Sequence, residues 1–181
     1  MAQGLSTVRR PFQGERIEVA ASMGFDAACA ALRRLMGKAS IPELVALAEA
    51  PITADEFSAQ VEARFVGESG FMLFDEINHG GWLSKFGIRR RTVRWIYGNP
   101  LIAVTMIRHD ITAGLFAPVE MLITEDADGA GTSLVYVRPS SLMVIEDNPP
   151  LLEAAKALDA KCEALLASAL GAPVVASPAT A

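Results

Sequence analysis

Alternating and continuous apolar runs predict strands in two parts of the chain. In residues 16–21, the positions Ile17, Val19 and Ala21 alternate with more polar ones, as in a half-buried strand. Two apolar runs at 71–74 and 93–97 are typical of buried strands, and Gly98, Asn99 and Pro100 close the second. Between them lies a polar and cationic connection, an arrangement in which a scaffold can present reactive side chains.

The same pattern predicts a hairpin nearer the C-terminus. Residues 119–124 and 132–137 both favour strands, and the acidic, Gly-containing segment 125–129 between them favours a turn. The apolar run 101–107 is compatible with either a strand or a helix, because its periodicity does not distinguish them. Short connections between these strands indicate an antiparallel sheet.

Apolar residues at spacings of three and four predict four helices. Ser22 is a candidate cap for a helix that Gly37 ends, and Thr53 with Glu56 forms a capping-box signature for another. A helix at 41–50 has Pro42 near its start. The last and longest helix follows Asn148 and presents one broad apolar stripe, long enough to lie across a sheet.

These elements predict an α+β protein with an antiparallel sheet and a long C-terminal helix packed across it. We expect one domain over residues 16–170, preceded by an irregular lead-in at 1–15. A small-residue tail at 171–181 is expected to be disordered. The paired helices at 41–66 need a surface to pack on, which is either the sheet or a second copy in a homodimer.

Composition narrows the class of protein. Of the 181 residues, 51% are hydrophobic and 20% are charged, which is typical of a folded chain. The net charge of −5 disfavours nucleic-acid binding, because a phosphate backbone repels an acidic protein. No segment approaches the ~20 continuous apolar residues of a membrane span, and no secretory signal is visible. We therefore expect a cytoplasmic protein without a membrane partner.

Four short motifs resemble those of a known family. They are FDEINH at 74–79, WIYGNP at 95–100, AGLFAP at 113–118, and the acidic turn at 125–129 followed by Tyr136. Their shared order over about residues 16–170 resembles a bacterial domain-of-unknown-function family, number three hundred and two in that series. The resemblance implies a TBP-like α+β fold, and folds of this layout can hold a cavity between sheet and helix.

The chain departs from the family pattern at three places. Asn78 stands where the family usually has Asp before the motif histidine, and Phe116-Ala117-Pro118 replaces an Asp-Leu-Pro-like segment. The helices at 41–66 resemble an insertion. The resemblance carries no agreed activity.

His79 is the sharpest catalytic candidate, with Glu76 close enough in sequence to orient it. Histidine exchanges a proton near neutral pH, and Gly80-Gly81 would let a ligand approach. The alternative is a hydrogen-bonded residue at a strand end. No second axial ligand or haem-attachment motif accompanies His79, and no His/Cys cluster indicates a metal, so we predict no metal site and leave the cofactor open, with haem a remote option.

Cationic and aromatic residues gather near His79 in an otherwise acidic chain. Arg91 and its neighbours suit a carboxylate or phosphate group, although a solvated basic edge is the alternative. Aromatic residues near strands either line a pocket or fill the core. The residues expected to bind a ligand are Trp82, Arg91, Tyr97, Asn99, Phe116 and Tyr136.

Three functional hypotheses follow. The first is a small-molecule-binding protein whose pocket lies between the sheet and the C-terminal helix. The second is a cofactor-free acid–base enzyme, an isomerase, lyase or cyclase that uses His79 on a small organic substrate. The third is a dimeric interaction module built on the helices at 41–66.

Overall fold

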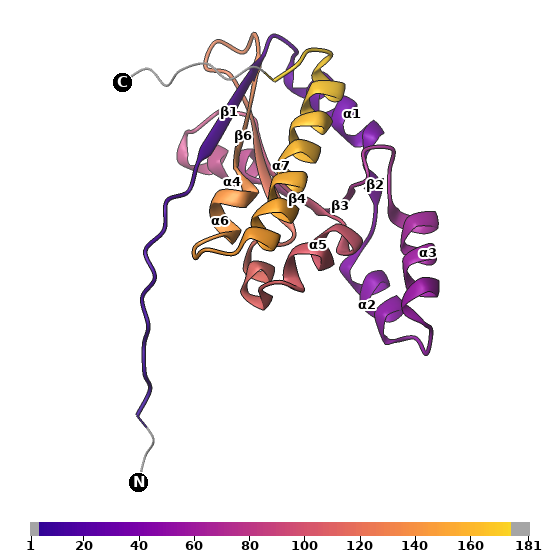
Figure 1. The fold of residues 1–181 in the computed structure, drawn as a ribbon. Coiled ribbons are helices and arrows are strands. Elements are labelled where there is room, and N and C mark those ends of the chain that lie inside the picture. Colours follow the sequence, from indigo (N-terminus) through magenta and orange to yellow (C-terminus); the bar gives the residue numbers. More distant parts are fainter. Residues whose placement is uncertain (1–3, 175–181) are drawn as a thin grey trace.

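The computed structural model describes residues 4–174 and contains one six-stranded sheet (Figure 1). The strand order is β1-β6-β5-β4-β3-β2, and neighbouring strands are antiparallel except for the parallel pair β2 and β3. The strands are β1 (Arg16–Ala21), β2 (Gly37–Lys38), β3 (Met72–Asn78), β4 (Thr92–Gly98), β5 (Val119–Glu125) and β6 (Thr132–Val137).

Seven α-helices and two 3₁₀ helices are found within residues 4–174. The α-helices are α1 (Phe25–Leu35), α2 (Ile41–Glu49), α3 (Ala54–Phe65), α4 (His79–Leu83), α5 (Pro100–Ile107), α6 (Pro139–Met143) and α7 (Pro149–Leu170). The 3₁₀ helices are η1 (Ser84–Phe86) and η2 (Ile111–Phe116). The α+β class and the long C-terminal helix are therefore confirmed.

Local sequence signals explain where several helices begin. The capping boxes Ser40/Glu43 and Thr53/Glu56 start α2 and α3, and the Asn148 side chain accepts from Leu151 N at the start of α7. The apolar run 101–107 is helical because Asn99 caps it and Pro100 occupies its first turn. The predicted cap of α1 was wrong, because Gly24 and not Ser22 occupies that position.

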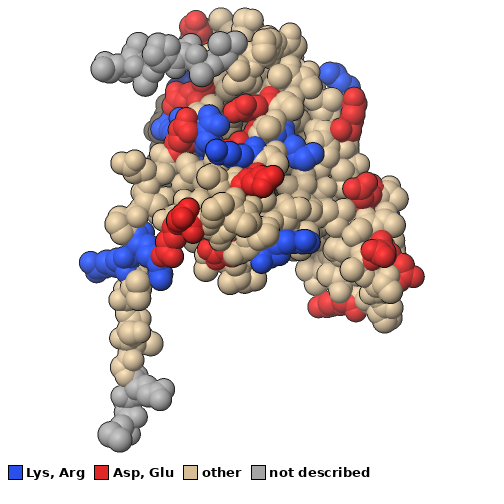
Figure 2. All heavy atoms as spheres, in the orientation of Figure 1, with Lys and Arg blue, Asp and Glu red and all other residues tan. Residues whose placement is uncertain are grey.

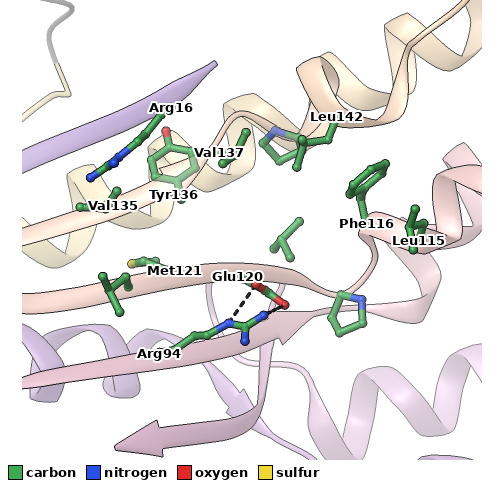
Figure 3. Close-up of a pocket in the computed structure, with 14 residues that line it drawn as sticks. Arg16, Arg94, Leu115, Phe116, Glu120, Met121, Val135, Tyr136, Val137 and Leu142 are labelled. Atoms are coloured by element: carbon green, nitrogen blue, oxygen red, sulfur yellow. Dashed lines mark hydrogen bonds and ion pairs between the residues drawn. The ribbon is translucent and has the colours of Figure 1, made fainter. Parts of the chain in front are cut away.

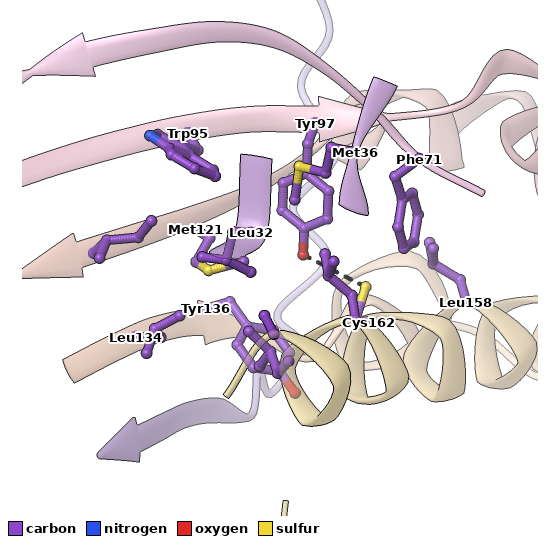
Figure 4. Close-up of a cluster of buried hydrophobic side chains, with 14 of the residues drawn as sticks. Leu32, Met36, Phe71, Trp95, Tyr97, Met121, Leu134, Tyr136, Leu158 and Cys162 are labelled. Carbon is purple, nitrogen blue, oxygen red and sulfur yellow. Dashed lines mark hydrogen bonds between the residues drawn. The ribbon is translucent and has the colours of Figure 1, made fainter. Parts of the chain in front are cut away.

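The helices α1 and α7 cover one face of the sheet and form the main core with it (Figures 1 and 4). Strand residues alternate in burial, so Trp95, Tyr97, Ile123 and Leu134 face these helices and are 0–1% exposed. α7 contributes buried residues along its whole length: Leu151, Ala155, Leu158, Cys162, Leu165, Leu166 and Ala169.

The predicted cavity between the sheet and the C-terminal helix is wrong, because side chains fill that interface. The rings of Phe71 and Tyr97 meet edge to face at 5.3 Å, and the Tyr97 hydroxyl lies 3.6 Å from Cys162 Sγ (Figure 4). A void of only about 20 Å³ remains beside Leu158 and Asn99. That volume holds no more than a single water.

The segment with α2 and α3 leaves and rejoins the sheet at one point. A Cβ on Gly37 would lie 1.8 Å from Phe65 O, and one on Gly67 would lie 2.1 Å from Gly37 N. Glycine at both positions therefore lets the outgoing and returning backbones touch. The two helices enclose a second, smaller core around Leu47, Val61, Phe65 and Met72.

The chain ends carry no further elements in the described region. Residues 4–15 contain no helix or strand, and Figure 1 shows the first of them running away from the body. The predicted disordered tail begins at Gly171, and its residues 175–181 lie outside the described part of the chain.

Candidate functional site

A charged cleft of about 600 Å³ opens between α1 and the adjoining ends of β3 and β4. Its walls combine two acids, four arginines, a buried cysteine and glycine backbone. The lining residues that matter below are Phe25, Asp26 and Arg33 of α1, Glu76 and Asn78 of β3, Gly80 of α4, and residues 89–91 of the following loop.

Strand register and helix periodicity together bring these side chains to one place. Glu76 is paired with Trp95 and Asn78 with Val93, and directly paired residues of antiparallel strands point to the same face. Glu76 and Asn78 therefore point to the face that α1 covers, where Trp95 and Val93 are buried. On α1, Asp26 and Arg33 are seven residues apart and so share a helix face.

The first ion pair of the cleft joins Arg33 to Glu76. Arg33 Nε donates to Glu76 Oε1 at 2.8 Å and Nη2 donates to Oε2, so the contact is bidentate. The guanidinium also stacks over the Trp95 ring, 5.1 Å from its centroid. The hydrogen bonds from Arg33 hold the pKa of Glu76 below its usual range, and the same contact raises the pKa of Arg33.

The second ion pair repeats this arrangement with different residues. Arg91 Nη1 donates to Asp26 Oδ2 at 3.0 Å, and Nη2 donates to Oδ1. Its guanidinium lies 4.5 Å from the centroid of the Phe25 ring. Hydrogen bonding to Arg91 lowers the pKa of Asp26, whose side chain is nevertheless 81% exposed. Solvent screens this pair much more than the Arg33–Glu76 pair.

A buried donor without a partner lies beside the first pair. Trp95 is fully buried, and its Nε1 has no hydrogen-bond partner of acceptable geometry among the described residues. The indole N–H nevertheless helps to lower the pKa of Glu76, which places it near that carboxylate. Figure 4 shows the nitrogen on the side of the ring away from Tyr97 and α7. A buried donor without a partner is costly.

Positive charge is concentrated at this end of the sheet. Residues 79–94 contain five basic residues and no acid: Lys85, Arg89, Arg90, Arg91 and Arg94. Arg90 donates to the carbonyl of Glu125, whereas Arg89 forms no ion pair within residues 4–174. Figure 2 shows acidic side chains over α2 and α3 at the lower right. The net negative charge therefore conceals a local cationic site.

His79 follows the cleft residue Asn78 in sequence, does not line the cleft itself, and contacts Trp82. Its Nδ1 accepts from Trp82 Nε1 at 3.3 Å, and the two rings meet edge to face. In neutral imidazole the other nitrogen, Nε2, then carries the proton. Glu76 does not orient His79, because both of its carboxylate oxygens bind Arg33. Trp82 itself is 52% exposed.

Gly80 serves the packing of α4 as well as the shape of the cleft. A Cβ at this position would lie 2.9 Å from the carbonyl oxygen of Arg90 and 3.1 Å from Thr92 N. Only glycine therefore lets α4 lie directly against the start of β4. Its neighbour Gly81 donates its N–H to the Asn78 side chain, which caps the helix.

Two of the predicted ligand-binding residues have structural positions instead. Tyr97 is 1% exposed inside the main core, and burial raises the pKa of its hydroxyl well above the usual value. Asn99 is 8% exposed, and its Oδ1 accepts from Leu101 N while its Nδ2 donates to Gly70 O. Both side chains are thus committed to contacts within the protein.

Phe116 and Tyr136 border a different cavity, on the other face of the sheet. Although Tyr136 borders this cavity, it alternates along β6 with the outward-facing Val135 and Val137 and belongs to the main core. Burial raises the pKa of its hydroxyl to about 12. The structure therefore separates the predicted residues: Glu76 and Arg91 line the cleft, whereas the side chains of His79 and Trp82 do not.

The sequence pattern did not reveal that α1 contributes to the cleft. Phe25, Asp26 and Arg33 form one wall of the cleft, although they precede its other residues by more than forty positions. The available signal was the spacing of Asp26 and Arg33, which puts opposite charges two helical turns apart on one face.

Comparison with known proteins identifies the family. The sequence profile described as "Domain of unknown function DUF302" matches residues 48–169. The chain belongs to the DUF302 family. A similar solved structure is that of an uncharacterized conserved DUF302 protein from Bacillus stearothermophilus, with a TM-score of 0.60 and 16% identity over 85% of this chain and 97% of that one. No curated protein matches the sequence.

Other predicted properties of this DUF302 protein stay open. Within residues 4–174, no three His, Cys, Asp or Glu side chains are grouped so that they could hold a metal ion. None of the helices in this region has the length and apolar character needed to cross a bilayer. Cytoplasmic location and homodimer formation stay predictions.

Proposed function

We propose that this protein binds a small organic anion, with carboxylate or phosphate groups, in the cleft between α1 and the ends of β3 and β4. Its leading support is the pair of arginines, Arg33 and Arg91, each stacked on an aromatic ring and already oriented by a carboxylate. Orientation before binding lowers the entropy cost of holding a ligand. A volume of about 600 Å³ is in the range of small-molecule sites.

The charge of the cleft favours an anion over a neutral molecule. Four arginines face two carboxylates, and Arg89 has no ion pair among the described residues. Arginine binds carboxylate and phosphate oxygens through two parallel hydrogen bonds.

In this proposal, Asp26 competes with the ligand for the guanidinium of Arg91. It uses the same two guanidinium nitrogens of Arg91 that an incoming carboxylate would use, and it is largely exposed. A ligand can therefore displace it without uncovering a buried charge. This feature supports a binding site over a purely structural ion pair.

The acid–base enzyme is the weaker hypothesis. His79 has a defined tautomer through its contact with Trp82, so Nε2–H can act as a donor. The two acids of the cleft are held by arginines, and Asp75 accepts from the backbone of Glu76. Binding therefore accounts for more of these contacts than proton transfer does.

Calorimetric titration with succinate and with inorganic pyrophosphate tests the proposal and distinguishes the two classes of anion. We expect saturable binding that weakens as salt is added. Arg91→Gln and Arg89→Gln should each raise Kd by about tenfold, because each removes a charge-assisted contact. Arg34→Gln is the matched control, since Arg34 lies on α1 but does not line the cleft.

The proposal fails if neither anion binds, or if Arg34→Gln weakens binding as much as Arg91→Gln does. Binding of succinate alone would assign carboxylates as the ligand class, and binding of pyrophosphate alone would assign phosphates.

A further inference from the structure

The face of the sheet opposite α1 and α7 carries a separate apolar recess of about 340 Å³ (Figure 3). Its floor is formed by outward-facing residues of β4, β5 and β6. The register places Arg94 beside Leu122 and Leu122 beside Val135, which makes one continuous row across three strands. Neither of the long helices covers this row, because both pack on the other face.

A wall at one end of the floor strands makes this a recess and not simply an open sheet face. Phe116 and Pro118 rise at the start of β5, and Pro139 with Leu142 of α6 rises after β6. Figure 3 shows Phe116 and Leu142 near each other at one end of the floor strands. Its volume is at the lower end of the range for small-molecule pockets.

The N-terminal segment packs against the same wall, which Phe116 and Leu142 form. The Phe12 ring meets the Phe116 ring edge to face at 6.1 Å. A Cβ on Gly14 would lie 3.5 Å from Val137 and 3.6 Å from Leu142, so the backbone of this segment runs along the recess. Glu15 then joins the sheet, where its carbonyl accepts from Arg138 N.

The charged residues of the recess differ in how firmly they are paired. Arg94 binds both carboxylate oxygens of Glu120, and Figure 3 shows this pair on the floor. Arg16 pairs with Glu18 of its own strand, and their side chains are 66% and 59% exposed. An exposed pair of this kind is weak, so the Arg16 guanidinium can take another carboxylate in place of Glu18.

From these contacts we infer that the recess is a second binding site, for a small amphipathic carboxylate. The hydrocarbon part of the ligand lies on Leu122, Val135 and Val137, and its carboxylate pairs with Arg16. Burial of the hydrocarbon supplies the affinity, and the charge sets the orientation. The site is independent of the cleft at α1, which lies on the other face of the sheet.

Titration with octanoate and with 1-octanol tests this inference. Octanoate should bind saturably and more tightly than octanol. Val137→Trp fills the recess from a position that is 37% exposed, and it should weaken both ligands by about tenfold or more. Arg16→Gln should reduce octanoate affinity to that of octanol and leave octanol unchanged. Arg91→Gln, in the other cleft, should change neither.

Three results would overturn the inference. The first is a titration of wild-type protein to millimolar octanoate that shows no saturation. The second is a Val137→Trp variant that keeps the wild-type circular dichroism spectrum and binds octanoate as wild type does. The third is a dimer, seen by sedimentation, that Val137→Trp dissociates, which would assign this face to a second copy of the chain.

Discussion

The interface between the sheet and α7 is closed to solvent, whereas the cleft beside α1 is open to it, and their polar groups are paired differently. At the interface, Tyr97 and Cys162 satisfy each other inside a packed core, and burial raises the pKa of both groups. In the cleft, Arg33 and Arg91 are held by carboxylates that remain partly or largely exposed. The aromatic residue Tyr97, near the end of β4, therefore belongs to the core, whereas the arginines around the cleft remain open to solvent and to a ligand of the kind proposed.

The largest expected effect tests whether the interface is packed. Phe71→Ala should lower the free energy of unfolding by about 3–5 kcal/mol, because it leaves a cavity against Tyr97. Phe86→Ala is the control at a side chain that is 75% exposed, where we expect a change within about 0.5 kcal/mol. Urea denaturation measures both, and equal losses would show that the interface is open.

Glu76→Gln should cost about 1 kcal/mol at neutral pH, a value reduced for the partial exposure of the ion pair. The folded protein lowers the pKa of Glu76, so the contribution is present above about pH 4 and is lost as pH falls through the folded-state pKa. The difference between variant and wild type should therefore vanish in acid. Glu62→Gln, on the exposed surface of α3, is the control, and a pH-independent difference would contradict this origin.

Tyr97→Phe should lower stability by up to about 1 kcal/mol, since only the hydroxyl contact with Cys162 is removed from an otherwise intact core. The variant should also bind anions as wild type does, because Tyr97 does not line the cleft. Thermal unfolding and calorimetry measure the two properties, and a large loss of anion affinity would place the site at the interface.

The smallest expected effect tests whether Asp26 competes with the anion for Arg91 or only orients Arg91. Asp26→Asn should tighten anion binding a few-fold by freeing Arg91, with little change in thermal stability. Asp55→Asn, on α3, is a charge-matched control that separates the local effect from the change in net charge. Unchanged or weaker binding would show that Asp26 orients Arg91 without competing for it.

Much of the fold follows from short-range signals in the sequence. Alternation predicts β1, β5 and β6, and caps at Thr53 and Asn148 predict the starts of α3 and α7. The run at 101–107 was ambiguous by period alone, and β2 is too short to leave a pattern.

The site was less accessible to sequence reasoning because it depends on tertiary contacts. Glu76 was predicted as a partner of His79, its neighbour in sequence, yet the fold pairs it with Arg33 of a distant helix. Arg91 was predicted to bind a ligand, which stays a prediction. It lines the cleft, but its partner Asp26 carries no local signal of that role. Such pairings arise only when α1 packs across β3 and β4.

Backbone amide chemical shifts during titration with succinate or pyrophosphate show where the anion binds. We expect the largest shifts around Gly80, Gly81 and Arg91, on both sides of the cleft, while Val137 and the core of α7 stay unchanged. Shifts confined to residues at the sheet–α7 interface, or spread evenly over the basic surface, would contradict the proposed site.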